Sequence, residues 1–210
     1  MKRLNRELKF FNLCFFLVIF NAAFAKEITL EIGNSKVDYA ALEKLSSNRG
    51  DVFKFDGADS FKVTLGGRNI YFLASSVIIS NDKLPNGSAV RRGHCEFDFY
   101  DAKYEYVNGI RVNVRDYADT NVCNWIEGVS AVTYKNQPAL LVTVQYHRGI
   151  DPATTVNEIG NNYHDFTALL TLDPHPDGSL SVHQDDSCLG PMNQIGELAI
   201  ARKRITECNR

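Results

Sequence analysis

Residues 129–147, with the sequence VSAVTYKNQPALLVTVQYH, carry the clearest structural pattern in the chain. In the second half of this stretch every other residue is apolar, and these residues are Leu140, Val142, Val144 and Tyr146. Because successive side chains of a β-strand point to opposite faces, the four belong to one face of a strand. The intervening positions become progressively polar toward His147, which is typical of an antiparallel strand with one face on a core. The stretch therefore predicts a hairpin near the middle of an antiparallel sheet, with residues 135–138 as its turn.

The segments on either side of this hairpin show similar alternation and are predicted to be strands. They are residues 27–32, 52–55, 61–65, 69–80, 94–100, 110–114, 163–173 and a return strand that begins at Leu180. Apolar residues at helical spacing predict one helix at 35–46 and a second helix that Asn193 caps. The predicted fold class is mainly β (α+β): an antiparallel sheet or sandwich-like β meander with one helix near each end, stapled by two disulfides. Trp125, the only tryptophan, is expected to be buried at the edge of the core.

Two connections in the first half of the chain are predicted from their turn residues. The dipeptide Asn108-Gly109, between Val107 and Ile110, is the strongest short hairpin signal and is typical of a type I′ turn. Residues 81–93 contain a proline, an Asn-Gly pair and the pair Arg91-Arg92, and this composition predicts a surface loop.

The first 25 residues have the organisation of a secretory signal peptide. A basic region is followed by an apolar run at residues 13–20 and by Ala23-Phe24-Ala25, an A-x-A cleavage site. We expect cleavage after Ala25, which leaves residues 26–210 as a single exported β-rich domain in the periplasm or secreted. No later stretch is apolar enough for a membrane anchor, so no membrane insertion is expected after cleavage.

The charge of the mature chain limits the classes of partner. The whole chain has 23 basic and 25 acidic residues, and the signal peptide contains four of the basic residues and one of the acidic residues. The mature net charge is therefore −5. Proteins that bind nucleic acid or anionic membranes carry a basic surface, so neither is expected as the main partner.

Four cysteines remain after cleavage: Cys95, Cys123, Cys188 and Cys208. An even number in an exported protein indicates two disulfides, and four cysteines allow three pairings. We favour the sequential pairing, Cys95–Cys123 and Cys188–Cys208, because each bond then closes a modest local loop. A zinc site built from the four thiolates is the alternative, but the chain lacks C-x-x-C spacing and export makes such a site less favourable.

Two groups of side chains are candidates for a metal site or for acid–base chemistry. His94, Glu96 and Asp98 alternate along one predicted strand, so the three would project from one face. The competing interpretation, which we favour, is a solvent-facing polar stripe opposite Cys95, Phe97 and Phe99. His147 and His164 flank the polar stretch 148–162, and a returning antiparallel strand would bring them close together.

Short catalytic and cofactor motifs are absent from the sequence. It contains no G-x-S-x-G, S-x-x-K set or H-E-x-x-H for catalysis, no phosphate loop and no dinucleotide fingerprint. We therefore name no catalytic residue and expect no cofactor.

Tyrosines and arginines near the Asn108-Gly109 turn form the main candidate interface. Tyr104 and Tyr106 are expected to share a face with Arg111 and Arg115 across that turn, and protein interfaces are enriched in both residue types. Arg91 and Arg92 are expected to reach a partner from their loop.

Taken together, these features predict an exported, non-enzymatic binding protein of the inhibitor or immunity type, whose partner is another exported protein. It would block that partner through a rigid β surface. The alternatives are an exported hydrolase that uses His147 or His164 with a carboxylate or a metal, and a structural component of the envelope.

Overall fold

The computed structural model describes residues 27–32, 52–54, 60–83, 89–114, 122–147, 163–190 and 193–210. At residues 52–54, 78–83, 89–92, 122 and 147 only the backbone is described. The predicted signal peptide, the predicted helix at 35–46 and the stretch 148–162 lie outside the described residues.

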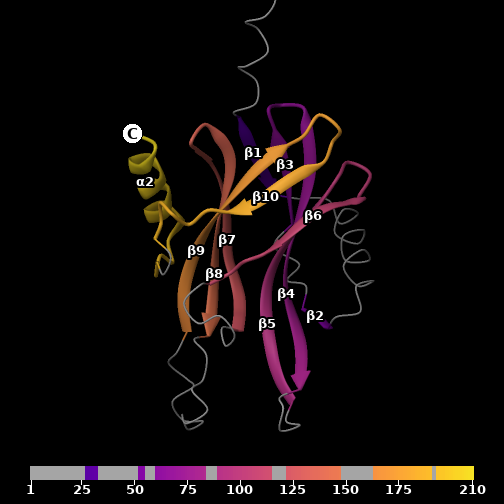
Figure 1. Ribbon diagram of the computed structural model, residues 1–210, viewed down its shortest axis with the longest axis vertical. Helices are drawn as coiled ribbons and strands as arrows, with labels where there is room; N and C mark the ends of the chain where they lie inside the picture. The colour runs from indigo at the N-terminus through magenta and orange to yellow at the C-terminus, as the bar shows by residue number, and fades with distance from the viewer. Residues whose placement is uncertain are drawn as a thin grey trace, which may run out of the picture.

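The described residues form two antiparallel sheets and one helix (Figure 1). The first sheet contains β1 (Ile28–Ile32), β2 (Val52–Lys54), β3 (Ser60–Leu65), β4 (Asn69–Lys83), β5 (Ala89–Tyr100) and β6 (Tyr106–Arg111). Its order is β1-β3-β4-β5-β6, and β2 pairs with the far half of β4. The second sheet contains β7 (Val122–Tyr134), β8 (Gln137–His147), β9 (Tyr163–Pro174) and β10 (Leu180–Gln184), in the order β10-β9-β8-β7. The helix is α2 (Leu198–Cys208).

The two sheets pack face to face around one hydrophobic core. The first sheet contributes fully buried side chains such as Leu73, Phe97 and Phe99, and the second contributes Phe166 and Leu170. These residues occupy alternate positions of their strands, as the sequence pattern predicts. The prediction of a mainly β protein built from antiparallel sheets is therefore confirmed.

The central hairpin is formed by β7 and β8, but two details of its prediction are wrong. The turn contains only Lys135 and Asn136, which both have positive φ, and Gln137 and Pro138 already belong to β8. Two residues with positive φ are the geometry of a type I′ turn, which matches the twist of the strands. The first part of the second face of β8 is also buried rather than exposed, because Leu141 packs beneath the C-terminal helix and Thr143 is buried as well.

Helix α2 forms a third layer on the outer face of the second sheet, the face turned away from the first sheet (Figure 1). Ala201 and Ile205 of the helix are buried in a second apolar cluster with Leu141 and Leu169 of the sheet. Asn193 does not cap this helix, whose N-cap residue is Glu197.

Asn193 instead protects the edge of β9. Its side-chain oxygen accepts a hydrogen bond from Thr167 N at 3.1 Å, and its amide nitrogen donates one to Thr167 O at 3.0 Å. An amide side chain thus satisfies the backbone of a strand edge that β10, which pairs further along β9, does not reach.

The two disulfides follow the favoured sequential pairing. Cys95–Cys123 joins β5 of the first sheet to β7 of the second, with a Cα–Cα distance of 5.5 Å. Cys188–Cys208 joins the end of α2 to the segment after β10, with a Cα–Cα distance of 6.1 Å. One bond therefore connects the sheets and the other fastens the helix layer.

Two predicted connections in the first sheet are wrong. Asn108 and Gly109 lie inside the continuous strand β6, and the chain instead turns at residues 101–105, where Asp101 N donates to Glu105 O and Tyr104 has a φ of 64°. The predicted loop at 81–93 is largely a continuation of the hairpin, since β4 reaches Lys83 and β5 begins at Ala89. Local turn chemistry was outweighed in both places by cross-strand pairing over longer segments.

Candidate functional site

The outer face of the first sheet contains the predicted His94, Glu96 and Asp98 series. Strand alternation places them opposite the core residues of β5, as expected. The solvent-facing stripe that we favoured is wrong for the two carboxylates, because Glu96 is 8% exposed and Asp98 is 3% exposed. His94 is half-buried. Buried carboxylates require a partner, so their surroundings decide what this face can do.

Glu96 forms an ion pair with Arg111 on the neighbouring strand β6. Arg111 Nη2 lies 2.7 Å from Glu96 Oε1, and Arg111 Nε donates a hydrogen bond to the same oxygen at 2.8 Å. The two residues face each other directly in the β5–β6 register. Arg111 is thus a structural partner of a buried carboxylate, although half of its side chain remains accessible.

Asp98 faces Gly109 of β6, and the two are packed closely. A Cβ atom placed on Gly109 would overlap the Asp98 carboxylate and would lie 2.9 Å from the Tyr106 hydroxyl. Ala74 of β4 flanks Asp98 on the other side. The Asn-Gly sequence is therefore explained by space for a buried carboxylate rather than by a turn.

The predicted Tyr/Arg interface is not organised as one hairpin face. Tyr104 lies in the 101–105 turn, where its ring stacks on Phe72 with 4.7 Å between centroids. The Tyr106 ring packs edge-on against Tyr100 at 5.9 Å, and half of Tyr106 is exposed. Arg115 lies outside the described residues, and Arg91 and Arg92 are described by backbone alone, on β5. The use of these residues in binding remains a prediction.

The predicted histidine pair lies on neighbouring strands at offset positions. The β8–β9 register pairs Tyr146 with His164 and His147 with Tyr163. The His164 ring contacts Tyr146, with 5.9 Å between centroids, while the side chain of His147 is not described. Within the described part of the chain, no three His, Cys, Asp or Glu side chains are grouped so that they could hold a metal ion.

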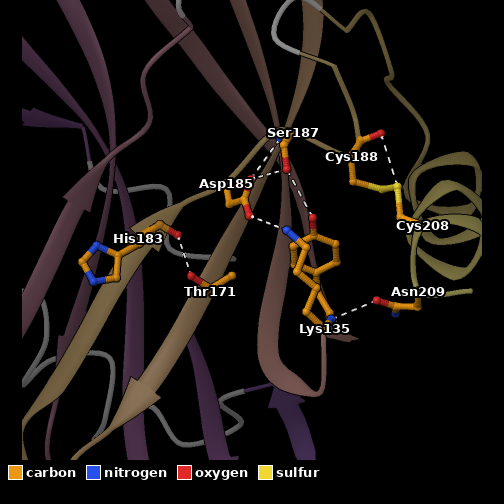
Figure 2. A network of polar contacts seen from close by, with 9 residues as sticks. Lys135, Thr171, His183, Asp185, Ser187, Cys188, Cys208 and Asn209 are labelled. Carbon is orange, nitrogen blue, oxygen red and sulfur yellow. Dashed lines mark hydrogen bonds and ion pairs between the residues drawn. A yellow bond between two sulfur atoms is a disulfide. The ribbon is translucent and has the colours of Figure 1, made fainter.

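A second polar cluster lies at the C-terminal end of α2 (Figure 2). The Ser187 hydroxyl donates to Asp185 and is 3.2 Å from the buried Tyr134 hydroxyl. Lys135 Nζ lies 3.5 Å from Asp185 and 4.6 Å from the centre of the Tyr134 ring. Hydrogen bonding from Ser187 lowers the pKa of Asp185, and hydrogen bonding with Tyr134 is the main cause that raises the pKa of Lys135.

The charges in this cluster are those of a structural ion pair, with a protonated Lys135 beside an ionised Asp185. A lysine whose pKa is raised stays protonated, and a carboxylate whose pKa is lowered is a weak proton acceptor for the Ser187 hydroxyl. The backbone nitrogen of Lys135 donates to Asn209 Oδ1 at 2.9 Å, and Asn209 Nδ2 donates to Thr133 O at 2.8 Å. Together with Cys188–Cys208, these bonds hold the end of α2 against the turn of the central hairpin (Figure 2).

Exposed aromatic side chains lie on the outer face of the second sheet, at the end away from the turn of the central hairpin. Trp125 is 36% exposed and Tyr163 is 47% exposed, so the prediction that Trp125 is buried is wrong. Two bulges in β7, between Cys123 and Trp125 and between Ile126 and Gly128, change its alternation. They keep Cys123 and Ile126 opposite the core positions Tyr146 and Val144, and turn Trp125 to the outer face. Sequence alternation alone could not locate these bulges.

No family model, curated protein or solved structure matches this chain. Among the described residues, no helix has the length and apolar character needed to cross a bilayer.

Proposed function

We propose that the mature chain is an exported, non-enzymatic binding protein of the inhibitor or immunity type, which blocks another exported protein through a rigid β surface. The observation that carries this proposal is the exposure of large aromatic side chains on the outer face of a disulfide-stapled sandwich. Trp125 and Tyr163 keep a third to a half of their surface accessible. Rigid aromatic side chains are the typical anchors of protein interfaces.

The environment of two carboxylates, Glu96 and Asp185, supports binding over catalysis at those positions. Glu96 is engaged by Arg111, and Asp185 is engaged by Ser187 and Lys135. Acid–base catalysis instead needs a titratable group that is free to exchange a proton with a substrate. The described pairs serve the stability of the scaffold.

The scaffold is also suited to steric blocking. Disulfides fasten both the two sheets and the helix layer, so the surface loses little conformational entropy when a partner binds. Disulfides also form and persist in oxidising compartments, which supports the periplasm or the extracellular space as the location.

Native mass spectrometry of the mature protein, purified gently from the exported fraction of its own host, tests the proposal. We expect a stoichiometric complex with a second exported protein, and we expect the purified complex to lack the partner's free activity. A lone chain that carries a metal or a small ligand would contradict binding and favour a hydrolase, to be tested by substitution of His147 and His164. Retention in the envelope fraction would favour a structural component instead.

A further inference from the structure

The outer face of the second sheet continues beyond the segment that leads into α2. Leu198 lies over β7, since a Cβ atom on Gly128 would be 3.1 Å from its side chain. Thr167 of β9 donates a hydrogen bond to Ile195 O at 2.6 Å. The register joins these positions into one row, Gly128–Thr143–Thr167, which the segment 195–198 covers.

The next row along the sheet contains Trp125, Gln145 and Asp165. Trp125 pairs with Gln145, and Gln145 pairs with Asp165. Neighbouring strands are about 4.8 Å apart, so Trp125 and Asp165 are separated by roughly 10 Å across Gln145. Tyr163 lies two residues before Asp165 on the same face of β9.

Carboxylates surround this row. Glu127 is exposed within the second bulge of β7. Asp165 lies against Gly196, where an added Cβ atom would overlap its carboxylate, and the following residue is the exposed Glu197. Asn124 joins the row through its side chain, which donates a hydrogen bond to Gln145 Oε1 at 2.8 Å. We call this surface the Trp125 patch and define it by seven residues: Asn124, Trp125, Glu127, Gln145, Tyr163, Asp165 and Glu197.

The patch has a defined chemical character. It combines two exposed aromatic rings with three carboxylates, and none of its seven residues is basic. Two of the three basic residues of α2 make contacts elsewhere, since Arg202 donates to Ser130 at 2.7 Å and Arg204 donates to Leu189 O at 3.0 Å. The patch is therefore complementary to a cationic group that also stacks on aromatic rings.

We propose that the Trp125 patch docks an arginine-bearing segment of the partner protein, an inference that rests on the proposed function. A guanidinium group stacks on the face of a tryptophan ring and, in the same plane, donates paired hydrogen bonds to a carboxylate. Trp125 supplies the ring, and carboxylates are supplied by Glu127, two residues further along β7, and by Asp165, across Gln145 in the same row. Lysine would satisfy the charge but would lose the planar stacking.

Trp125 provides its own reporter, because it is the only tryptophan in the chain. Nona-arginine with blocked ends is titrated into the mature protein at low ionic strength while Trp125 emission is recorded. The control peptide is nona-citrulline, which has the same shape without the charge. We expect a saturable change with nona-arginine alone, weakened by added salt. No saturable change, or an equal change with both peptides, would overturn the proposal.

Substitutions in the patch test where nona-arginine binds. The double variant Glu127→Gln and Asp165→Asn removes two charges without changing side-chain size, and we expect it to weaken nona-arginine binding roughly tenfold. Ile200→Ala, at an exposed position of α2, is the control and should leave the affinity unchanged. Circular dichroism establishes that each variant is folded. Equal affinity in the double variant and the wild type would refute the assignment, as would a homodimer that buries Trp125.

The same double variant separates this inference from the proposed function. If the native complex forms and survives the two substitutions, a partner exists but binds elsewhere, and the inference alone fails. If no native complex forms while the peptide still binds at Trp125, the blocking function fails and the chemistry of the patch stands.

Discussion

At the scale of single residues, the first sheet shows how burial changes the contribution of an ion pair to stability. Arg111 and Glu96 lie on neighbouring strands, and the carboxylate is almost fully buried. Lys62 and Glu31 form a similar cross-strand pair at 3.1 Å on the same sheet, but there the carboxylate side chain is 61% exposed. A buried carboxylate that loses its cation keeps its desolvation cost, whereas exposed charges return to water.

Arg111→Met is therefore expected to lower the free energy of unfolding by about 2 kcal/mol. Lys62→Met is the matched control and should change it by less than about 0.5 kcal/mol. Urea denaturation of both variants measures the difference. Equal effects would show that Glu96 does not depend on Arg111 for its stabilisation.

Gly109→Ala tests the close packing around Asp98. The new methyl group would overlap the carboxylate, and we expect a loss of about 1–3 kcal/mol in stability, as for other overpacked sites. Asp98→Ala provides the comparison, because in the double variant the space for the methyl group is restored and the two losses should not add. If the losses of the two single variants, measured by urea denaturation, simply added in the double variant, direct contact between position 109 and the Asp98 carboxylate would be contradicted.

At the scale of elements, α2 is held by polar ties as well as by its apolar face. Its buried residues are Ala201 and Ile205, which form a narrow contact for an eleven-residue helix. The cluster of Lys135, Asp185 and Ser187 fixes the segment that carries Cys188 (Figure 2). The helix layer is therefore expected to respond to protonation of this cluster.

Asp185→Asn is expected to show that response as a function of pH. The pKa of Asp185 is below its ordinary value of 3.8, so the folded carboxylate contributes stability above that pH and loses it as the pH falls through the folded pKa. Near pH 7 the variant should be less stable by up to about 1 kcal/mol, since the group is partly exposed. The difference should shrink as the pH falls below about 3.8 and disappear only below the folded pKa. Glu207→Gln, at an exposed position of α2, is the control, and a constant difference across the pH range would contradict the assignment.

At the scale of the whole molecule, the two disulfides stabilise different parts of the fold although they close loops of similar length. Their sequence separations are 28 and 20 residues. The chain-entropy model gives each about 3 kcal/mol. Cys95–Cys123 joins the two sheets that share the core, whereas Cys188–Cys208 joins only the helix layer.

The double variants Cys95→Ala/Cys123→Ala and Cys188→Ala/Cys208→Ala should therefore differ in hydrogen exchange. Loss of the first bond should raise exchange in both sheets together. Loss of the second should raise exchange in α2 while the sheets stay protected, because the helix can then open locally. The two variants have similar loop lengths and control for each other. The same exchange pattern in both would contradict this division.

The amino-acid sequence was sufficient for the features that depend on near neighbours along the chain. Alternation along β3, β8 and β9 identified the strands and the residues that face the shared core, such as Val63, Val142 and Phe166. Short loop lengths favoured the disulfide pairing that the structure contains. These features follow from the two-residue period of a strand and from loop-closure entropy, which are both local properties.

The features of the outer faces required the three-dimensional structure. Leu141 is buried because α2, far away in the sequence, packs on it, and Trp125 is exposed because two bulges in β7 change its alternation. Asn108-Gly109 stays in a strand because β6 pairs with the distant strand β5 at these positions. A polar or mixed strand face carries no local signal of what will cover it. Burial there depends on contacts between distant segments, and the same contacts position the residues of the candidate sites.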